Sequence, residues 1–375
     1  MRYKKGSRLR LGFIGCGHAT SELHLPALRH VPEVEVLALA DVDDQRLQAA
    51  GDRFRVSARY RNSADLLDDP RIEAVAVCVP PQQHVDLALA VLDAGKHLFV
   101  EKPLALSLAD CDRLIERASQ SRCKSQVGFN LRQHALVRQA RKIIQGGELG
   151  EVEALRSCFT AATRRQRDLP AWRNQRESGG GVLTEIATHH FDLWRFLLGT
   201  DVKQVFVDCR SDRTDDVAAT VIARMADGVS VSGVFSERTF GSNELEIFGR
   251  EGWLRLNLYR FDGFENASIR NHSGDLGLRL RQLWRTISAL PGRLTAKLRG
   301  VETLNLYQRQ WRRFANAVLR EGPIDATLQD GRAAAAVAAA AIESAATGQP
   351  AEVACRGVVA DGVRQPGDAS SDISV

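Results

Sequence analysis

Short apolar runs and amphipathic stretches alternate along the first third of the chain. The apolar runs, among them VEVLALAD at 34–41 and IEAVAVCVP at 72–80, show no polar alternation and predict strands buried on both faces. QHVDLALAVLDAG, at 83–95, carries apolar residues at helical spacing and ends on a glycine. Strands of this kind separated by helices predict a doubly wound parallel sheet covered by helices. We therefore expect an α/β fold in which residues 1–129 form an N-terminal Rossmann domain.

The pattern changes after this domain. Segments such as KQVFVDCRS and VSVSGVFSER are strand candidates separated by turns, and helices are predicted at roughly 134–146, 180–198 and 305–321. Mixed elements of this kind predict that residues 130–355 form a C-terminal α+β domain with a large, mostly antiparallel, open-faced sheet. The polar tail at 356–375 is expected to be disordered.

Composition is typical of a soluble globular protein with two domains. The 375 residues are 44% hydrophobic and 26% charged. Seven cysteines show no CxxC pair and no Cys/His metal spacing, so we expect no metal site and a reducing, cytoplasmic location. The apolar stretch LGFIGCG near the N-terminus is too short for a signal peptide. The alanine-rich stretch 331–348 is too short and too weakly apolar to span a bilayer, and it predicts a buried helix.

The net charge of +5 does not indicate a nucleic-acid partner for a chain of this size, and it is unevenly placed. Residues 269–300 hold seven Arg or Lys and one Asp, a local charge of +6. Within this basic segment, residues 276–299 carry a seam of leucine and isoleucine with arginines beside it. We favour a helix that packs on the sheet or on a partner subunit. Contact with an anionic membrane or an acidic substrate is the less favoured alternative.

The first predicted strand ends in a glycine turn that is typical of dinucleotide sites. In GFIGCGHATSELH, Gly15 permits a tight turn, and Gly17 lets the backbone approach a pyrophosphate. His18 and Ala19 follow, and Thr20 stands where the pattern usually has a third glycine or alanine. A glycine turn of this kind also occurs in βα units that bind nothing, so it needs support from elsewhere in the chain.

Asp41 supplies that support. It ends the second strand, 21 residues after Thr20, where the dinucleotide pattern has an acid for the ribose hydroxyls. A carboxylate there would repel a 2′-phosphate, which favours NAD over NADP, although Arg46 nearby would soften the preference. An ordinary turn or helix cap is the competing interpretation of Asp41.

The order of motifs resembles that of the Gfo/Idh/MocA family, which includes glucose–fructose oxidoreductase and inositol dehydrogenase. The resemblance covers nearly the whole chain apart from roughly 266–300 and the tail. It implies a nicotinamide-dependent oxidoreductase that interconverts a secondary alcohol and a ketone on a sugar, polyol or nucleotide-sugar-like substrate by hydride transfer. The segments that carry it are GFIGCG, HLPAL, VCVPPQQH, AGKHLFVEKPLA, AWRN, GGGVLTEIATHHFDL and ESAATGQP.

The resemblance also implies roles for two charged motifs. Lys102, in the Glu-Lys-Pro motif, would lie beside the nicotinamide and the reacting hydroxyl, with the Lys102–Pro103 bond cis and Glu101 on the cofactor side. An ammonium at the end of a parallel strand would stabilise developing alkoxide charge. His189 matches the catalytic histidine, because the family register selects it over His190. Glu185 stands where the family usually has aspartate, and Ala187 where it usually has glycine.

The predicted catalytic residues are therefore Lys102, His189 and Glu185. With Asp192, the last two have i, i+4, i+7 spacing and would share one helical face. The resemblance further implies cofactor contacts from Pro80 and His84. For His84 the alternative is a histidine on a helix surface, and for Trp172 and Arg173 it is a packed indole beside an exposed loop arginine. The resemblance implies substrate contacts from Asn130, Arg132, Trp172, Arg173 and Asp192.

Three explanations stay open for the glutamate at position 185 in place of the usual aspartate. The substrate differs from that of the usual family members, the acid has an orienting role that tolerates a small displacement of its carboxylate, or the activity is weakened. At the level of function, one alternative is a non-catalytic NAD-binding sensor or partner module. Another is a family variant that uses bound NAD for hydrolysis, elimination or isomerisation without net redox change. An open sheet would otherwise expose apolar surface, so we expect a homodimer or homotetramer formed through that face.

Overall fold

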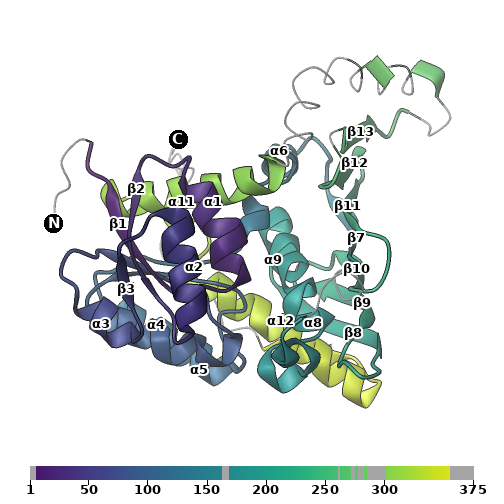
Figure 1. Ribbon diagram of the computed structural model, residues 1–375. Helices are drawn as coiled ribbons and strands as arrows, with labels where there is room; N and C mark the ends of the chain where they lie inside the picture. The colour runs from purple at the N-terminus through teal and green to yellow at the C-terminus, as the bar shows by residue number, and fades with distance from the viewer. Residues whose placement is uncertain are drawn as a thin grey trace, which may run out of the picture.

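Two sheets, each with its own helices, make up the fold. Figure 1 shows the N-terminal domain in purple and blue and the second sheet in teal and green, with α9 and α12 between them. The computed structural model describes residues 6–162, 169–260, 262–271, 275–277, 280, 283–284, 287 and 301–354, with the backbone alone for 301–303.

The first sheet has six strands in the order β3-β2-β1-β4-β5-β6, and every neighbouring pair is parallel. Its central strands are buried on both faces, as their unbroken apolar sequences predict. This confirms the expected Rossmann sheet. The strands are β1 (Leu9–Ile14), β2 (Val34–Ala40), β3 (Ala58–Tyr60), β4 (Ala74–Val77), β5 (His97–Val100) and β6 (Ser125–Val127).

The order of the strands reverses at the boundary between β1 and β4, which are neighbours although two strands separate them in sequence. In doubly wound sheets a ligand binds outside the carboxyl ends of the strands at such a point. The helices that cover this sheet are η1 (Ala19–His24), which is a π-helix, α1 (Leu25–Leu28), α2 (Asp44–Phe54), α3 (Ser63–Asp68), η2 (Pro81–Gln83), α4 (His84–Asp93) and α5 (Leu108–Ser119).

The second sheet has eight strands in the order β13-β12-β11-β7-β10-β9-β8-β14. All neighbouring pairs are antiparallel except β7 and β10, which run parallel. The strands are β7 (Val152–Thr160), β8 (Val202–Arg210), β9 (Ala218–Met225), β10 (Ser230–Ser236), β11 (Ser242–Gly249), β12 (Gly252–Asn257), β13 (Phe264–Ser268) and β14 (Ala351–Glu352).

Helices cover one face of this sheet, and residues on β9 alternate between buried and exposed along the strand. The mostly antiparallel, open-faced sheet expected from the sequence is therefore confirmed. The remaining helices are η3 (Asn130–Gln133), α6 (Ala135–Gln145), η4 (Ala171–Asn174), η5 (Arg176–Ser178), α8 (Val182–Glu185), α9 (Ala187–Leu198), α11 (Val301–Leu319) and α12 (Leu328–Thr347).

Helix α12 connects the two domains. It packs on α5 and β6 of the first domain and on α9 and β8 of the second. Its alanines, among them Ala334, Ala336 and Ala341, are buried, because small side chains allow neighbours to approach from several sides. The predicted buried helix at 331–348 is thus confirmed.

Helix α11 differs from the expected division of the chain. It lies within residues 130–355, yet Trp311, Phe314 and Val318 join the core of the first sheet beside Phe13 and Phe99. The cause is that α11 has one apolar face on an otherwise polar helix. This face is buried against β1, η1 and α1. The chain therefore returns to its N-terminal domain after building the second sheet.

Parts of two predictions fall outside the described residues. These are the tail at 356–375 and most of the basic segment, of which Leu276, Leu280, Trp284 and other described residues are exposed. Across the described ranges, no helix is both long enough and apolar enough to cross a membrane. The same ranges hold no cluster of three or more potential metal ligands, and their six cysteines form no disulfide.

Five histidines whose pKa is lowered by burial predict acid sensitivity. The pKa is lowered for His84, His97 and His189, and it is lowered to about 4 for His134 and His190. The unfolded chain therefore binds more protons than the folded one. We expect full stability above about pH 6.5, and a loss of up to about 1.4 kcal/mol per pH unit for each histidine as the pH falls below that value.

Urea unfolding between about pH 7 and pH 5 measures this slope. Replacing buried His190 by Gln should make the slope shallower, whereas His30→Gln, at an exposed position, should leave it unchanged. Equal slopes in both variants would contradict the assignment.

Candidate active site

The glycine turn after β1 has the geometry of a dinucleotide loop. Gly15 has φ +97°, and a Cβ atom there would lie 2.3 Å from the carbonyl oxygen of Cys78, so that only glycine fits. A Cβ at Gly17 would meet no atom within 4 Å, which leaves the backbone open to a ligand. Thr20 is buried and its hydroxyl donates to the carbonyl of Gly15 at 2.6 Å. The threonine thus closes the turn through its hydroxyl at the position where the usual pattern has a small residue.

Asp41 joins this turn to the end of β2. Its carboxylate oxygens accept the backbone N–H groups of Cys16 at 2.6 Å and Asp43 at 2.8 Å. Arg46 lies at the surface and pairs with Asp43 rather than Asp41. The Asp41 carboxylate therefore orders a local turn and also lies beside the glycine loop, with lone pairs left for a ligand.

The open cradle at Gly17 and the acid at the neighbouring strand end fit a dinucleotide. His18 is exposed and Ala19 half-buried at the start of η1, on the ligand side of the turn. Pro80 follows β4 and precedes η2 on the other side of the strand-order reversal. Gly15, Gly17, His18, Ala19, Thr20, Asp41 and Pro80 are therefore grouped at the edge where the sheet topology predicts a ligand.

Glu101, directly after β5, is held by a buried hydrogen-bond chain. The Trp311 indole N–H donates to His24 Nδ1 at 3.1 Å, and His24 Nε2 lies 3.0 Å from Glu101 Oε1. An indole N–H can only donate a hydrogen bond, so His24 Nδ1 must be the acceptor. His24 Nε2 then carries the ring N–H and donates a hydrogen bond to Glu101. Burial alone would raise the pKa of Glu101, but the His24 hydrogen bond and the charge of Lys102 outweigh burial and lower it. Glu101 is therefore a fixed carboxylate.

The other oxygen of Glu101 accepts the backbone N–H of Lys102 at 3.2 Å, and the Lys102–Pro103 bond is cis, as the resemblance implies. The ammonium of Lys102 reaches across to the second domain and donates to the carbonyl oxygen of Glu185 at 2.7 Å. Burial lowers the pKa of Lys102, while Glu185 and Glu101 act in the opposite direction. One donor of the ammonium is thus used and two remain.

This contact interrupts a helix. In a continuous helix the Glu185 carbonyl would accept the N–H of His189. The His189 N–H instead donates to Ile186 at 3.2 Å, α8 ends at Glu185, and α9 begins at Ala187. The expected single helical face for Glu185, His189 and Asp192 is therefore wrong in detail, because a break separates the first of these residues from the other two.

His189 lies one turn beyond the break, near Lys102. Burial lowers its pKa well below the usual value, and the positive charge of Lys102 and neighbouring His190 add to this. The ring is therefore neutral at neutral pH. Its Nδ1 is buried and has no hydrogen-bond partner among the described residues. His190 is fully buried, with Nε2 3.0 Å from Asn243 and its ring against Phe235, as expected of a core histidine.

Glu185 carries a buried carboxylate that is bound by Arg173. The Arg173 Nε donates to Glu185 Oε1 at 2.5 Å, and a second guanidinium nitrogen contacts both Oε2 and, at 3.0 Å, the buried Glu237. Gly180 permits this arrangement, because a Cβ there would lie 2.3 Å from the carbonyl oxygen of Arg173. Trp172 is half-buried beside Arg173 on η4. Arg173, Glu185 and Glu237 together form a charged wall near Lys102.

His84 and Asn130 flank the Glu-Lys-Pro turn. The two ring nitrogens of His84 lie 2.7 Å from the carbonyl oxygen of Pro103 and 2.9 Å from that of Val79, so this buried ring ties the ends of β4 and β5 together. Asn130 lies beside the Tyr307 hydroxyl, and its Oδ1 is buried without a partner in the described part of the chain.

Arg132 and Asp192 lie in a different cluster. Their charged groups bind each other at 2.7 Å and 2.5 Å, and both side chains are almost fully buried. Arg132 also contacts the backbone carbonyl of Asp325 and the carboxylate of Asp330. The two residues expected to bind substrate therefore pair with each other, away from the groups that surround Lys102.

Sequence reasoning missed His24, Glu237 and Trp311. His24 lies in the HLPAL motif that contributed to the resemblance, and a polar residue ahead of an apolar helix was the only signal for it. Trp311 is 287 residues away from it along the chain, and no local pattern connects the two.

Comparison with known proteins agrees with this geometry. Residues 9–129 match the family described as "Oxidoreductase family, NAD-binding Rossmann fold", and residues 137–255 match the "GFO/IDH/MocA C-terminal domain". The myo-inositol 2-dehydrogenase of Thermotoga maritima is 30% identical over 72% of this chain and 81% of its own length. The 1,5-anhydro-D-fructose reductase of Ensifer adhaerens is 28% identical over 92% of this chain and 98% of its own.

Among solved structures, levoglucosan dehydrogenase in complex with NADH superposes with a TM-score of 0.81, covering 92% of this chain and 99% of that one at 23% identity. This likeness concerns the fold, and the sequence matches carry the assignment. The chain belongs to the Gfo/Idh/MocA family of NAD-binding oxidoreductases.

Proposed function

We propose that this protein interconverts a secondary alcohol and a ketone on a sugar, polyol or nucleotide-sugar-like substrate, with Lys102 and His189 acting on the same oxygen. The observation that carries the proposal is the hydrogen bond from the Lys102 ammonium to the Glu185 carbonyl, which holds the ammonium at the helix break one turn before His189. The relatives named above act on an inositol and an anhydrofructose, which supports a polyhydroxylated substrate.

The chemistry divides between a cation and a neutral base. A nicotinamide dinucleotide held by the glycine turn and Asp41 would supply the hydride acceptor for alcohol oxidation and the hydride donor for ketone reduction. The two remaining Lys102 donors stabilise negative charge on the substrate oxygen. His189 is neutral because burial and the charge of Lys102 lower its pKa, so it can take the hydroxyl proton during oxidation and return it during reduction.

Arg173 supports an orienting role for Glu185. A carboxylate that is bound by a guanidinium fork has a fixed position, and the extra methylene of glutamate is accommodated by that pairing. Of the three explanations for Glu185, we favour one in which the carboxylate holds Arg173 and accepts a substrate hydroxyl. Trp172 and Asn130 are the other proposed substrate contacts.

The cofactor contacts are proposed for the glycine turn, Asp41, Pro80 and Glu101. His84 was expected to contact the cofactor, but its buried ring has both nitrogens on backbone carbonyls, so it supports the ends of β4 and β5 instead. NAD is preferred over NADP, because the Asp41 carboxylate lies beside the glycine turn where a 2′-phosphate would meet negative charge. A cytoplasmic location is proposed from the unpaired state of the six described cysteines.

Replacing Lys102 by Ala tests this mechanism. We expect turnover on polyols and sugars to fall by about 10²- to 10⁴-fold, because the charge on the substrate oxygen loses its donor, while NAD affinity stays within about threefold. The measurements are steady-state kinetics with NAD and NADP and a fluorescence titration of NADH.

Lys142→Ala, which removes an exposed lysine on α6, serves as the matched control and should keep full turnover. Turnover of the Lys102→Ala variant equal to that of the wild type would refute the mechanism. Turnover by the wild type without net NADH would identify the variant chemistry that uses bound NAD.

Trp311→Phe tests whether the buried chain positions Lys102. The phenyl ring fills most of the space but removes the N–H that fixes the His24 tautomer. We expect kcat to fall by about 10- to 100-fold with little change in NADH affinity, because the Glu-Lys-Pro turn loses its orientation. Trp284→Phe, at a position that is 71% exposed, is the control. A lower melting temperature with unchanged kcat would mean that Trp311 only packs.

The outer face of the second sheet is proposed to bind a second copy of the chain. Phe206 and Ile222 are cross-strand partners on this face, and Val234 and Phe248 add to the apolar surface, all four being 38% to 56% exposed. Exposed apolar side chains on the open face of a sheet are typical of an interface, and equal surfaces favour a homodimer or homotetramer.

A double substitution, Ile222→Glu and Val234→Glu, should shift the oligomer to monomer as measured by light scattering after size exclusion, because two buried charges would remain unpaired. Val42→Glu, at an apolar residue that is 91% exposed in the other domain, should leave the mass unchanged. An unchanged mass of the double variant would exclude this face.

A further inference from the structure

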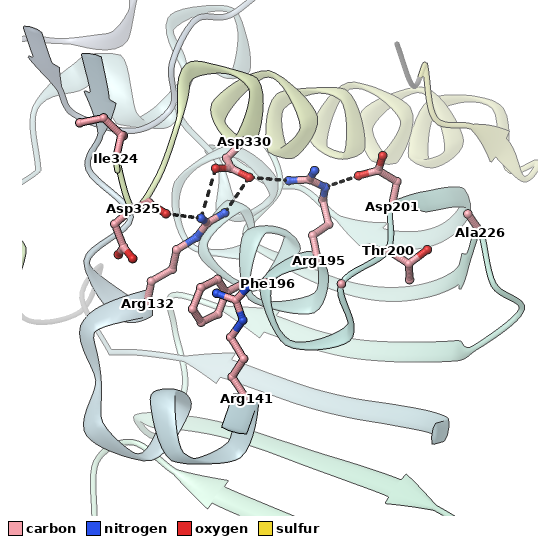
Figure 2. A pocket seen from close by; sticks show the side chains of 11 residues that line it. Arg132, Arg141, Arg195, Phe196, Thr200, Asp201, Ala226, Ile324, Asp325 and Asp330 are labelled. Atoms are coloured by element: carbon pink, nitrogen blue, oxygen red, sulfur yellow. Dashed lines mark hydrogen bonds and ion pairs between the residues drawn. The ribbon is translucent and has the colours of Figure 1, made fainter. Parts of the chain in front are cut away.

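A second cavity of about 690 Å³ lies apart from the proposed active site. Figure 2 shows its walls, which come from η3 and α6, the end of α9, the turn that follows α9, and the residues that lead into α12. Neither Lys102 nor His189 lines it, and neither does any residue of the glycine turn. Its size is that of a small-metabolite site.

The carboxylates in this cavity all have arginine partners. Asp201 pairs with Arg195 at 2.6 Å, Asp330 with Arg132 at 3.1 Å, and Asp325 with Arg138 at 2.5 Å (Figure 2 shows the first two pairs). Arg132 also pairs with the buried Asp192, and Arg195 also contacts Asp330 at 3.4 Å, so these acids and arginines form one connected network. The acids can still accept hydrogen bonds from hydroxyl groups of a ligand.

Arg141 lines the cavity without taking part in these ion pairs. Its guanidinium stacks on the ring of Phe196 with 3.9 Å between the carbon atom and the ring centroid. Within the described part of the chain it has no ion-pair partner, and its Nε is buried without a hydrogen bond. Two further guanidinium groups, of Arg132 and Arg138, lie 4.9 Å and 5.3 Å from the same ring. Three cations therefore surround one aromatic ring, and only two of them have carboxylate partners.

Two other cations lie close to Arg141. Burial lowers the pKa of Arg141 and the positive charges of Arg132 and Arg138 lower it further, while the carboxylates of Asp325 and Asp330 act in the opposite direction. An anion bound to Arg141 would relieve this repulsion. Stacking on Phe196 fixes the plane of the guanidinium, so its donor edge is oriented in advance for a planar carboxylate or a phosphate.

We propose that this cavity binds a small metabolite through a carboxylate or phosphate group held by the Arg141 guanidinium. The volume exceeds what one such group fills, so the rest of the ligand lies toward Thr200 and Asp201, whose polar atoms suit hydroxyl groups. No residue proposed for hydride or proton transfer lines the cavity, so binding there can be measured separately from turnover.

Calorimetric titration of the NAD-saturated protein with inorganic phosphate, at constant ionic strength set with chloride, tests the proposal. Saturating NAD occupies the dinucleotide site, which would otherwise bind phosphate itself. We expect wild-type protein to bind phosphate, and Arg141→Gln to weaken binding by about tenfold or more, because a charge-assisted fork is lost. Lys142→Gln, which removes the same charge from the adjacent exposed position, should bind as the wild type does.

Arg141→Lys retains the charge but loses the fork, and it should bind with intermediate affinity; it also replaces the glutamine variant if that one does not fold. Wild-type protein that gives no heat beyond the chloride control would overturn the proposal. So would equal phosphate affinity in the wild type and in whichever Arg141 variant is folded. Either result leaves the Lys102 mechanism untouched, because that mechanism is measured by turnover.

Discussion

The hydrogen bond from Lys102 to the Glu185 carbonyl is the constraint on which the site depends. It joins a turn at the end of β5 to a helix of the second domain, 83 residues later in sequence. The same carbonyl would otherwise extend α8 into α9, so the contact both locates the ammonium and ends the helix there. His189 therefore lies in the first turn of α9, close to the cation.

This proximity assigns different protonation states to two groups that share one site. Lys102 has three carboxylates nearby, those of Glu185, Glu101 and Glu237, which favour its charged form against the cost of burial. Among the described residues no carboxylate pairs with His189, which is close to that charge, so its neutral form is favoured. Burial lowers the pKa of both groups, but carboxylates oppose the shift at Lys102 whereas a cation adds to it at His189, which suits the two groups to separate roles as cation and base. Arg173 completes the arrangement by neutralising the acids that would otherwise compete for the ammonium.

Local patterns in the sequence predicted the sheet types and the glycine turn. Burial on one or both faces of a strand determines the order of apolar and polar residues along it, and the turn requires glycines at a fixed spacing. The resemblance added Lys102 and His189. Contacts between distant segments were beyond either argument. Trp311 was assigned by position to the second domain, yet its indole fixes a histidine of the first. The helix break at Ile186 was also missed, since it is caused by a lysine from another domain rather than by any residue of the helix itself.

Arg132 and Asp192 were expected to bind substrate, but their partners in the structure favour a role in holding the two domains together. An isolated buried charge is costly, and a buried pair gains stability only when its geometry and remaining hydrogen bonds are satisfied. Here Arg132, on η3, bonds to Asp192 of α9 and Asp330 of α12, so one guanidinium joins three elements at the boundary of the domains. Because α12 packs on both domains and α9 carries His189, this pairing favours one relative position of the two domains. That position is the one in which the Lys102 ammonium reaches the Glu185 carbonyl, so the ion pair and the hydrogen bond depend on the same domain arrangement.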